Sequence, residues 1–370
     1  MSYTDTLGVQ SIAQIYDRLS MELYFTHIYT TTGKRASLKT IVLISKIDPE
    51  SIEIVAKRKS KLDDFTINIT RIENNLYRGF LRRKTKKGLV GGFFLLDSSV
   101  ENKWILFSND SAYFIDHVLE SFFDKLYPFV SRVYFNYSEM KVFLNEIKDN
   151  YKGKTEYTKF TIKRIKKQTN LPSSLKKKKG TMILWEHNAD EELFIQSKDY
   201  LLIVNRLNYN IRDNKTNMLL LRSSLSRKGK CTLEYGVFKD FYNNVILTTV
   251  NYGKNRTKFY NLRERIMINE KIELRPFTIQ YPNKIDIYSI RGIPSKLINS
   301  YSTAIIHNGN PYFVATLSDY DEGSSFGITI LGDVVTITPI SKGSPEASWK
   351  LTEKIQEILG DGNIINVDVE

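Results

Sequence analysis

The spacing of apolar residues constrains this chain most, because long stretches follow the two-residue period of a β-strand. Phe65–Thr70 and Ser51–Val55 alternate apolar and polar residues, and Thr40–Ser45 is a short run rich in β-branched residues. Runs of this length, bounded by turn residues, are typical of half-buried or buried strands. We therefore expect a β-rich fold with few helices.

A helical period replaces this pattern twice in the first 150 residues. Ser111–Leu126 places Ile115, Val118 and Phe122 on one face, and Ser138–Tyr151 repeats the pattern. The remaining expected strands of this part are Gly91–Asp97, Lys103–Ser108 and Val133–Phe135. A sheet with attached helices is an α+β unit.

Strand patterns return after residue 180. The expected strands are Met182–Trp185, Tyr200–Val204, Met218–Leu221, Ile272–Tyr281 and Ile285–Ile290. Residues 236–250 are compatible with either a helix or a strand, and the sequence leaves that choice open.

The last 60 residues carry the clearest pattern. The expected meander strands are Pro311–Leu317, Gly327–Leu331 and Val334–Thr338, with Gly332-Asp333 as the last tight turn. Ser344 as N-cap and Pro345 at the first helical position then begin a helix, which Gly360 ends.

Together these patterns predict an α+β fold of β-rich mixed sheets with a few helices, ending in a small meander-plus-helix module. The expected division is an N-terminal α+β domain, a basic linker, a β-rich basic middle domain and an acidic C-terminal α+β module, at residues 1–150, 151–180, 181–310 and 311–370.

The charge of the chain is unevenly distributed. Its 54 Lys and Arg residues against 41 Asp and Glu residues give a net charge of +13. Residues 311–370 hold three basic and ten acidic residues, a charge of −7, so the first 310 residues carry +20. Such asymmetry is typical of a chain that contacts nucleic acid in one region and a different partner in another.

Basic residues gather in three clusters and one turn of the positive part. Arg78–Lys87 holds six cations, Lys152–Lys179 holds eleven against Glu156 alone, and Tyr252–Arg265 holds five with interleaved aromatics. Arg227–Lys230 marks an expected hairpin tip. Basic side chains contact phosphates and aromatic rings stack on bases, although a solvated surface accounts equally well for any single cluster.

The candidate nucleic-acid-binding residues come from these segments. They are Arg78, Arg82, Arg83, Lys84, Lys86, Lys87, Tyr157, Lys159, Lys163, Arg164, Lys166, Lys167, Arg227, Lys228, Lys230, Lys254, Arg256, Lys258, Tyr260, Arg263 and Arg265.

The residues offer little for catalysis. Four histidines without metal-ligand spacing and the single Cys231 predict no catalytic site, no metal, no cofactor and no intramolecular disulfide. Basic residues before Cys231 favour a lowered thiol pKa, but no histidine motif accompanies it. The alternative is a divergent metal-dependent nuclease that uses acids such as Asp97 and Glu146.

No apolar run reaches the length of a membrane span, and the start does not have the pattern of a signal peptide. We therefore expect a cytoplasmic protein without membrane insertion.

The overall build resembles one known family. The β-rich opening with Lys103–Ser108 leading into Ser111–Leu126, the basic middle and the closing Pro311–Gly360 module are similar to the accessory proteins of short prokaryotic Argonautes that carry an APAZ-type region. The resemblance covers most of the chain and rests on no short motif. It implies a heterodimer with the Argonaute, binding of guide and target nucleic acid, and a role in antiviral defence. No fused effector domain is recognisable, so the resemblance also implies that another protein delivers toxicity.

The expected function is thus a non-catalytic, nucleic-acid-binding subunit of a multiprotein complex. Its expected partners are DNA or RNA, contacted mainly through the backbone, and a protein such as a short Argonaute.

Overall fold

The computed structural model confirms a β-rich α+β architecture with two main antiparallel sheets. It describes residues 37–85, 88–164, 181–184, 202–263, 266–268, 271–309 and 312–366. The chain forms two compact units: the first comprises the part up to Phe135 with Met140–Thr158 and Arg206–Gly253, and the second comprises Asn136–Glu139, Lys159–Asn205 and the part from Lys254 onward.

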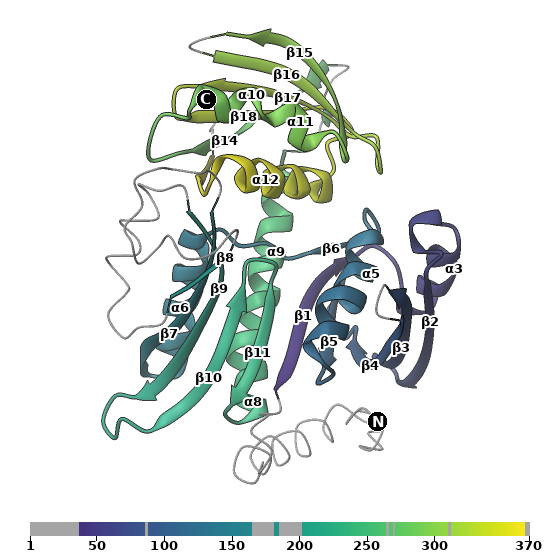
Figure 1. Cartoon of the computed structure of the whole chain (residues 1–370), viewed down its shortest axis with the longest axis vertical. Helices are drawn as coiled ribbons and strands as arrows, with labels where there is room; N and C mark the ends of the chain where they lie inside the picture. The colour runs from purple at the N-terminus through teal and green to yellow at the C-terminus, as the bar shows by residue number, and fades with distance from the viewer. Residues whose placement is uncertain are drawn as a thin grey trace. The chain divides into compact units, whose positions relative to one another are not determined.

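The larger sheet has eleven strands (Figure 1). Its order is β2 (Phe65–Glu73), β3 (Leu76–Thr85), β4 (Gly88–Asp97), β5 (Lys103–Ser108), β1 (Leu38–Ser45), β11 (Lys230–Tyr235), β10 (Leu219–Ser226), β9 (Leu202–Asp213), β7 (Gly153–Arg164) and β8 (Thr181–Leu184), and β6 (Val130–Arg132) pairs with β1.

Strand β1 lies inside the sheet, between β5 and β11, and its residues are buried on both faces. All its residues except Lys39 are buried, and it pairs antiparallel with β5, β6 and β11. A strand that is apolar on both faces needs a covering layer on each side.

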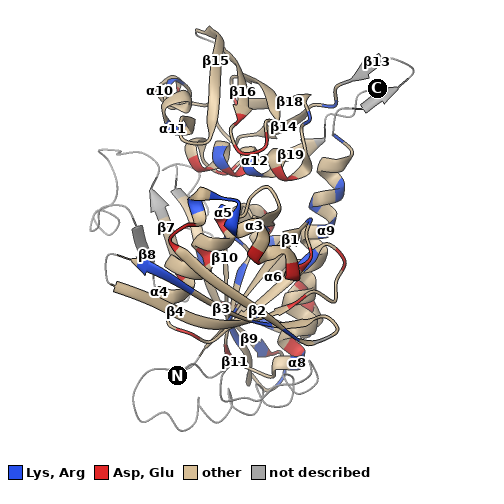
Figure 2. Ribbon diagram, turned by 90° about the vertical axis from the view of Figure 1, so that its right-hand side faces the viewer, with Lys and Arg blue, Asp and Glu red and all other residues tan. Residues whose placement is uncertain are grey.

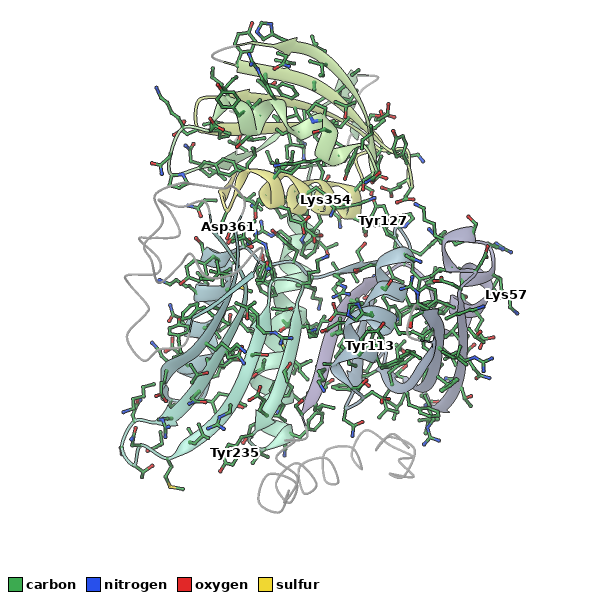
Figure 3. All side chains as sticks on the ribbon, viewed as in Figure 1. Lys57, Tyr113, Tyr127, Tyr235, Lys354 and Asp361 are labelled. Atoms are coloured by element: carbon green, nitrogen blue, oxygen red, sulfur yellow. The ribbon has the colours of Figure 1, made fainter. Side chains whose placement is uncertain are left out.

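The first covering layer is the helical segment α4 (Ala112–Phe114), η3 (Ile115–Leu119) and α5 (Glu120–Lys125), in which η3 is one π-helical turn. Ser111 begins it, because its Oγ accepts the Phe114 N–H at 3.2 Å. The Phe123 ring packs edge-on against Phe94 and Trp104, with centroids 5.9 Å and 6.5 Å away. Figure 3 shows how side chains fill the layer between α5 and the strands. This apolar layer is a hydrophobic core of the first unit.

The second covering layer settles the open choice for residues 236–250 in favour of a helix. It comprises α8 (Phe238–Phe241), the π-helical turn η5 (Tyr242–Ile246) and α9 (Leu247–Asn261). Phe238 packs edge-on against Phe107 of β5 at 5.9 Å, and the Tyr242 hydroxyl donates to Asp97 Oδ2 at 3.1 Å. Phe107 and Asp97 point away from the first layer, so these helices cover the opposite face of the sheet.

The second unit contains a six-stranded sheet with one helical cover (Figure 1). Its order is β15 (Tyr301–Asn308), β16 (Tyr312–Asp319), β17 (Ser325–Leu331), β18 (Val334–Ser341), β14 (Phe277–Gln280) and β19 (Asn363–Asn366). Alternation predicts its two faces well: Phe313, Ala315 and Leu317 of β16 are buried, and the residues between them are half-buried.

The helix α12 (Pro345–Leu359) closes this sheet as the sequence predicts. The Ser344 Oγ accepts the Ala347 N–H at 3.2 Å, and Gly360 ends the helix at a φ of 100°. Near that end, Asp361 Oδ2 accepts the Tyr137 N–H at 3.2 Å (Asp361 is labelled in Figure 3).

The second unit also contains two short helices and a pair of short strands. Helices α10 (Ile287–Arg291) and α11 (Ile293–Leu297) precede β15, and β12 (Ile266–Ile268) pairs with β13 (Lys271–Glu273).

Three expected strands are wrong. Ser51–Val55 is helical: Ser51 ends the 3-10 turn η1 (Pro49–Ser51), and the rest lies in the helix α3 (Ile52–Lys57), where Ile52 and Ala56 fall on one helical face and are buried. Residues 285–290 lead into α10, where the Asp286 side chain caps the helix by accepting the Ser289 N–H at 3.1 Å. The third, Val133–Phe135, follows β6 as irregular chain, and α6 (Tyr137–Asn150) comes next.

The contacts divide the chain differently from the expected boundaries. Strand β11 pairs with β1 over Leu38–Ile41, which joins part of the expected middle domain to the first unit. Strand β14 lies between β18 and β19, so the C-terminal module extends upstream of residue 311. In both cases a distant strand completes a sheet, and sequence periodicity carries no information on such pairing.

Candidate nucleic-acid interface

The strand period divides the first basic cluster between two faces of the sheet. Arg78, Arg82 and Lys84 of β3 point away from the core, whereas Arg83 points to the side of the buried Leu81. One cluster in the sequence is therefore two sets of side chains in the structure.

Arg83 is engaged within the fold. Its Nε donates to Asp64 Oδ2 at 2.7 Å, its guanidinium lies 4.6 Å from the Phe65 ring centroid, and it also donates to the His117 carbonyl at 3.0 Å. These contacts tie β3 to the covering helix, so Arg83 is placed to stabilise the fold.

The outward residues at one end of β2, β3 and β4 define a surface that we call the open face; the outward Leu76, Leu95 and Asp97 at the other end are buried and do not belong to it. Its ten residues are Thr66, Asn68, Thr70, Arg78, Phe80, Arg82, Lys84, Leu89, Gly91 and Phe93. Arg82 and Lys84 are exposed, and among the described residues neither side chain takes part in an ion pair. None of the ten residues is acidic, so the open face is positively charged.

Two aromatic residues lie within the open face. Phe80 of β3 is directly opposite Phe93 of β4, their ring centroids are 4.8 Å apart, and both are half-buried. Neither ring was among the predicted residues. The alternation of Arg78, Phe80 and Arg82 along one strand is the signal that could have identified Phe80, whereas Phe93 requires knowledge of strand pairing.

The hairpin tip at Arg227–Lys230 is a turn between β10 and β11, as expected, but two of its cations are buried. Arg227 Nε donates to the Tyr134 hydroxyl at 2.5 Å, and its guanidinium lies 4.9 Å from that ring centroid. Lys228 is half-buried and has interactions of its own. The burial of Arg227 contradicts its predicted role at an accessible phosphate site.

Lys230 is likewise engaged inside the first unit. Its ammonium lies 2.5 Å from Asp116 and 2.6 Å from Glu120, whose carboxylate also pairs with Arg132 at 2.8 Å. Burial raises the pKa of the Glu120 carboxyl, but the charges of Arg132 and Lys230 outweigh it and hold that pKa below its ordinary value. The predicted phosphate contact for Lys230 is therefore also contradicted.

The third cluster lies on α9 and the turn after it. Tyr260 is fully buried with its hydroxyl donating to Thr352 at 3.0 Å, so its ring offers no face for stacking. Arg263 is buried with its guanidinium 3.7 Å from the Phe259 ring centroid, and Arg256 pairs with Glu139. The predicted stacking role of Tyr260 and phosphate roles of these two arginines conflict with this packing.

Lys254 and Lys258 are the exposed cations of that helix. They lie one turn apart, and neither has an ion pair with another described residue. Blue positions recur along α9 in Figure 2. They form a second accessible basic surface, on the second unit.

The second cluster is described only in part. Tyr157 and Lys159 are half-buried on β7, and both have interactions within the protein. The backbones of Lys163 and Arg164 continue β7. The remaining predicted residues, Lys86, Lys87, Lys166, Lys167 and Arg265, lie outside the described residues.

The groups considered for catalysis occupy separate environments. Burial raises the pKa of the Cys231 thiol to about 12, contrary to the expected lowering. Asp97 is buried at the end of β4, whereas Glu146 is exposed on α6. In the part of the chain that the structure describes, no group of three or more His, Cys, Asp or Glu side chains is arranged to hold a metal ion.

None of the helices in the described segments combines the length and the apolarity that crossing a membrane requires. Comparison with known proteins adds no family assignment: no protein-family model matches the chain, and no curated protein sequence matches it.

Proposed function

We propose that this protein is a non-catalytic nucleic-acid-binding subunit whose open face contacts the phosphate backbone. The observation that carries the proposal is the exposure of Arg82 and Lys84 on a face without acidic residues. Lysine and arginine contacts to phosphates release counterions, which supplies affinity without sequence preference.

The geometry of β3 supports backbone contact. Side chains two residues apart on a strand are separated by about 6.8 Å, so Arg82 and Lys84 can engage successive phosphates of an extended strand. Thr66 lies directly across from Arg82 on β2, and its hydroxyl adds a neutral hydrogen-bonding group beside the cations.

The exposed lysines of α9 support a second contact. Lys254 and Lys258 belong to the second unit, where they form a basic surface of their own that can contact phosphates. Their contribution is electrostatic, because the nearby Tyr260 ring is buried.

We propose further that the protein acts in the cytoplasm with a protein partner, as the resemblance to short-Argonaute accessory proteins implies. The support in this chain is the edge strand β15, where Ile305 and Ile306 are 48% and 69% exposed. Apolar side chains on an unpaired sheet edge favour association with another protein. Co-expression with a short Argonaute should yield a stable complex, and the partnership is contradicted if the two proteins separate on gel filtration.

The proposal predicts that removing two open-face cations weakens binding. The double variant Arg82→Gln/Lys84→Gln should bind a fluorescently labelled oligonucleotide on the order of tenfold less tightly at low salt, because two phosphate contacts are lost. Fluorescence anisotropy measures the affinity.

The matched control is Lys57→Gln/Arg58→Gln. These two cations are exposed at the end of α3, away from the open face, and their removal changes net charge by the same amount. Equal weakening by both double variants would show that overall charge, and not the open face, supplies the affinity.

A further inference from the structure

The phenylalanines distinguish the open face from a surface that only contacts phosphates. Phe80 and Phe93 are cross-strand partners, and their rings meet at 4.8 Å with an interplanar angle of 50°. Both retain solvent contact, although large apolar side chains at such positions are normally covered.

The core does not account for these two rings. The neighbouring residues Leu81 and Phe94 point to the opposite face and are fully buried under α4–α5. On the side of Phe93, the second helical layer covers β5 at Phe107 and the end of β4 at Asp97. Phe80 and Phe93 therefore lie where that layer stops.

Gly91 lies next to both Arg82 and the half-buried Phe80 ring. A Cβ atom at Gly91 would lie 3.0 Å from the Arg82 Cβ and 3.3 Å from the Phe80 Cζ, so the base of the Arg82 side chain and the edge of the Phe80 ring both lie next to this glycine. An aromatic ring flanked by an arginine presents a stacking face and a phosphate contact together.

We infer that the open face binds single-stranded nucleic acid, with bases stacked on Phe80 and Phe93 and phosphates on Arg82 and Lys84. This inference rests on the proposed function and specifies its ligand. Bases of a duplex are already stacked and paired, so their faces cannot reach the two rings. Asn68 lies directly across from Phe80, where its amide can hydrogen-bond an unpaired base edge.

The test compares a labelled single strand of about twelve nucleotides with a duplex of the same length. The variant Phe80→Leu/Phe93→Leu should lose roughly 10- to 100-fold in single-strand affinity, because a base–aromatic stack is lost at each position. We expect the protein to bind the duplex less tightly than the single strand, and the double variant should have the same duplex affinity as the wild-type protein. Phe80→Tyr should retain single-strand affinity, since the ring remains.

The matched control is Phe129→Leu. Phe129 is 38% exposed in the same unit but lies before β6, outside the open face. Circular dichroism and thermal unfolding establish that each variant is folded.

The outcomes separate the two claims. If wild-type protein binds neither ligand, the proposed function fails. If it binds both equally, and Arg82→Gln/Lys84→Gln weakens binding while Phe80→Leu/Phe93→Leu does not, the proposed function stands and the single-strand inference is overturned.

A measurement on the wild-type protein keeps the test independent of variant folding. Photocross-linking with a 5-iodouracil oligonucleotide should attach the label to peptides that contain Phe80 or Phe93. Labelling confined to other peptides would contradict the inference.

Discussion

Individual cations in this protein have different roles according to which way the backbone points them. Arg82 and Arg83 are adjacent in the chain, yet Arg82 reaches solvent on the open face and Arg83 pairs with Asp64. In a strand such a one-residue difference reverses the direction of the side chain. Counting basic residues in a window therefore overestimates the accessible charge.

Lys230 illustrates the internal role and gives a prediction at the residue scale. Its side chain is 8% exposed between Asp116 and Glu120. Replacing it with methionine should lower the free energy of unfolding by about 3 kcal/mol, because two carboxylates lose a buried partner. Urea denaturation measures the change, and nucleic-acid affinity should stay the same.

Lys239→Met is the control for that prediction, because Lys239 is exposed on α8. It should alter stability by less than about 0.5 kcal/mol. Equal stability of the two variants would contradict the stabilising role of Lys230. Loss of nucleic-acid binding in Lys230→Met alone would indicate that Lys230 contacts phosphate.

At the scale of elements, regular patterns were predictable from the sequence. The strand Lys103–Ser108 has the expected bounds, the expected Gly327–Leu331 is found as β17 with two more residues at its start, and the cap at Ser344 begins α12 as expected. Alternation and capping depend on residues close together in the chain, so these elements can be predicted from the amino-acid sequence.

The elements that were mispredicted are short. Helix α3 has only six residues, and the apolar positions Ile52, Ile54 and Val55 fit the pattern of a strand as well as that of a short helix. Tertiary packing decides such cases, since the local preference is weak. The π-helical turns η3 and η5 also lie outside what periodicity alone predicts.

The candidate site was predictable only in part, for the same reason. Arg82, Lys84, Lys254 and Lys258 are exposed as the clusters suggest, but Tyr260 is buried. Phe93 could not be identified from the sequence, because its importance comes from pairing with Phe80 on another strand. Strand register is a non-local property.

At the scale of the whole molecule, the net charge of +13 reflects two regions of opposite sign. The acidic C-terminal segment is partly neutralised from within, since Lys350 lies 3.1 Å from Asp319 and 3.2 Å from Asp321. Figure 2 shows basic and acidic positions close together on α12. The strongest candidate for nucleic-acid contact therefore remains the first unit, where the open face has no acidic residue.

The central claim is that the open face binds nucleic acid through phosphate contacts. The most direct measurement is the slope of the logarithm of the association constant against the logarithm of salt concentration, for a single-stranded oligonucleotide. The wild-type slope should be negative, and Arg82→Gln/Lys84→Gln should reduce its magnitude by about 1.4, or about 0.7 for each lost contact. An affinity that does not change with salt, or an identical slope in the variant, would contradict the account.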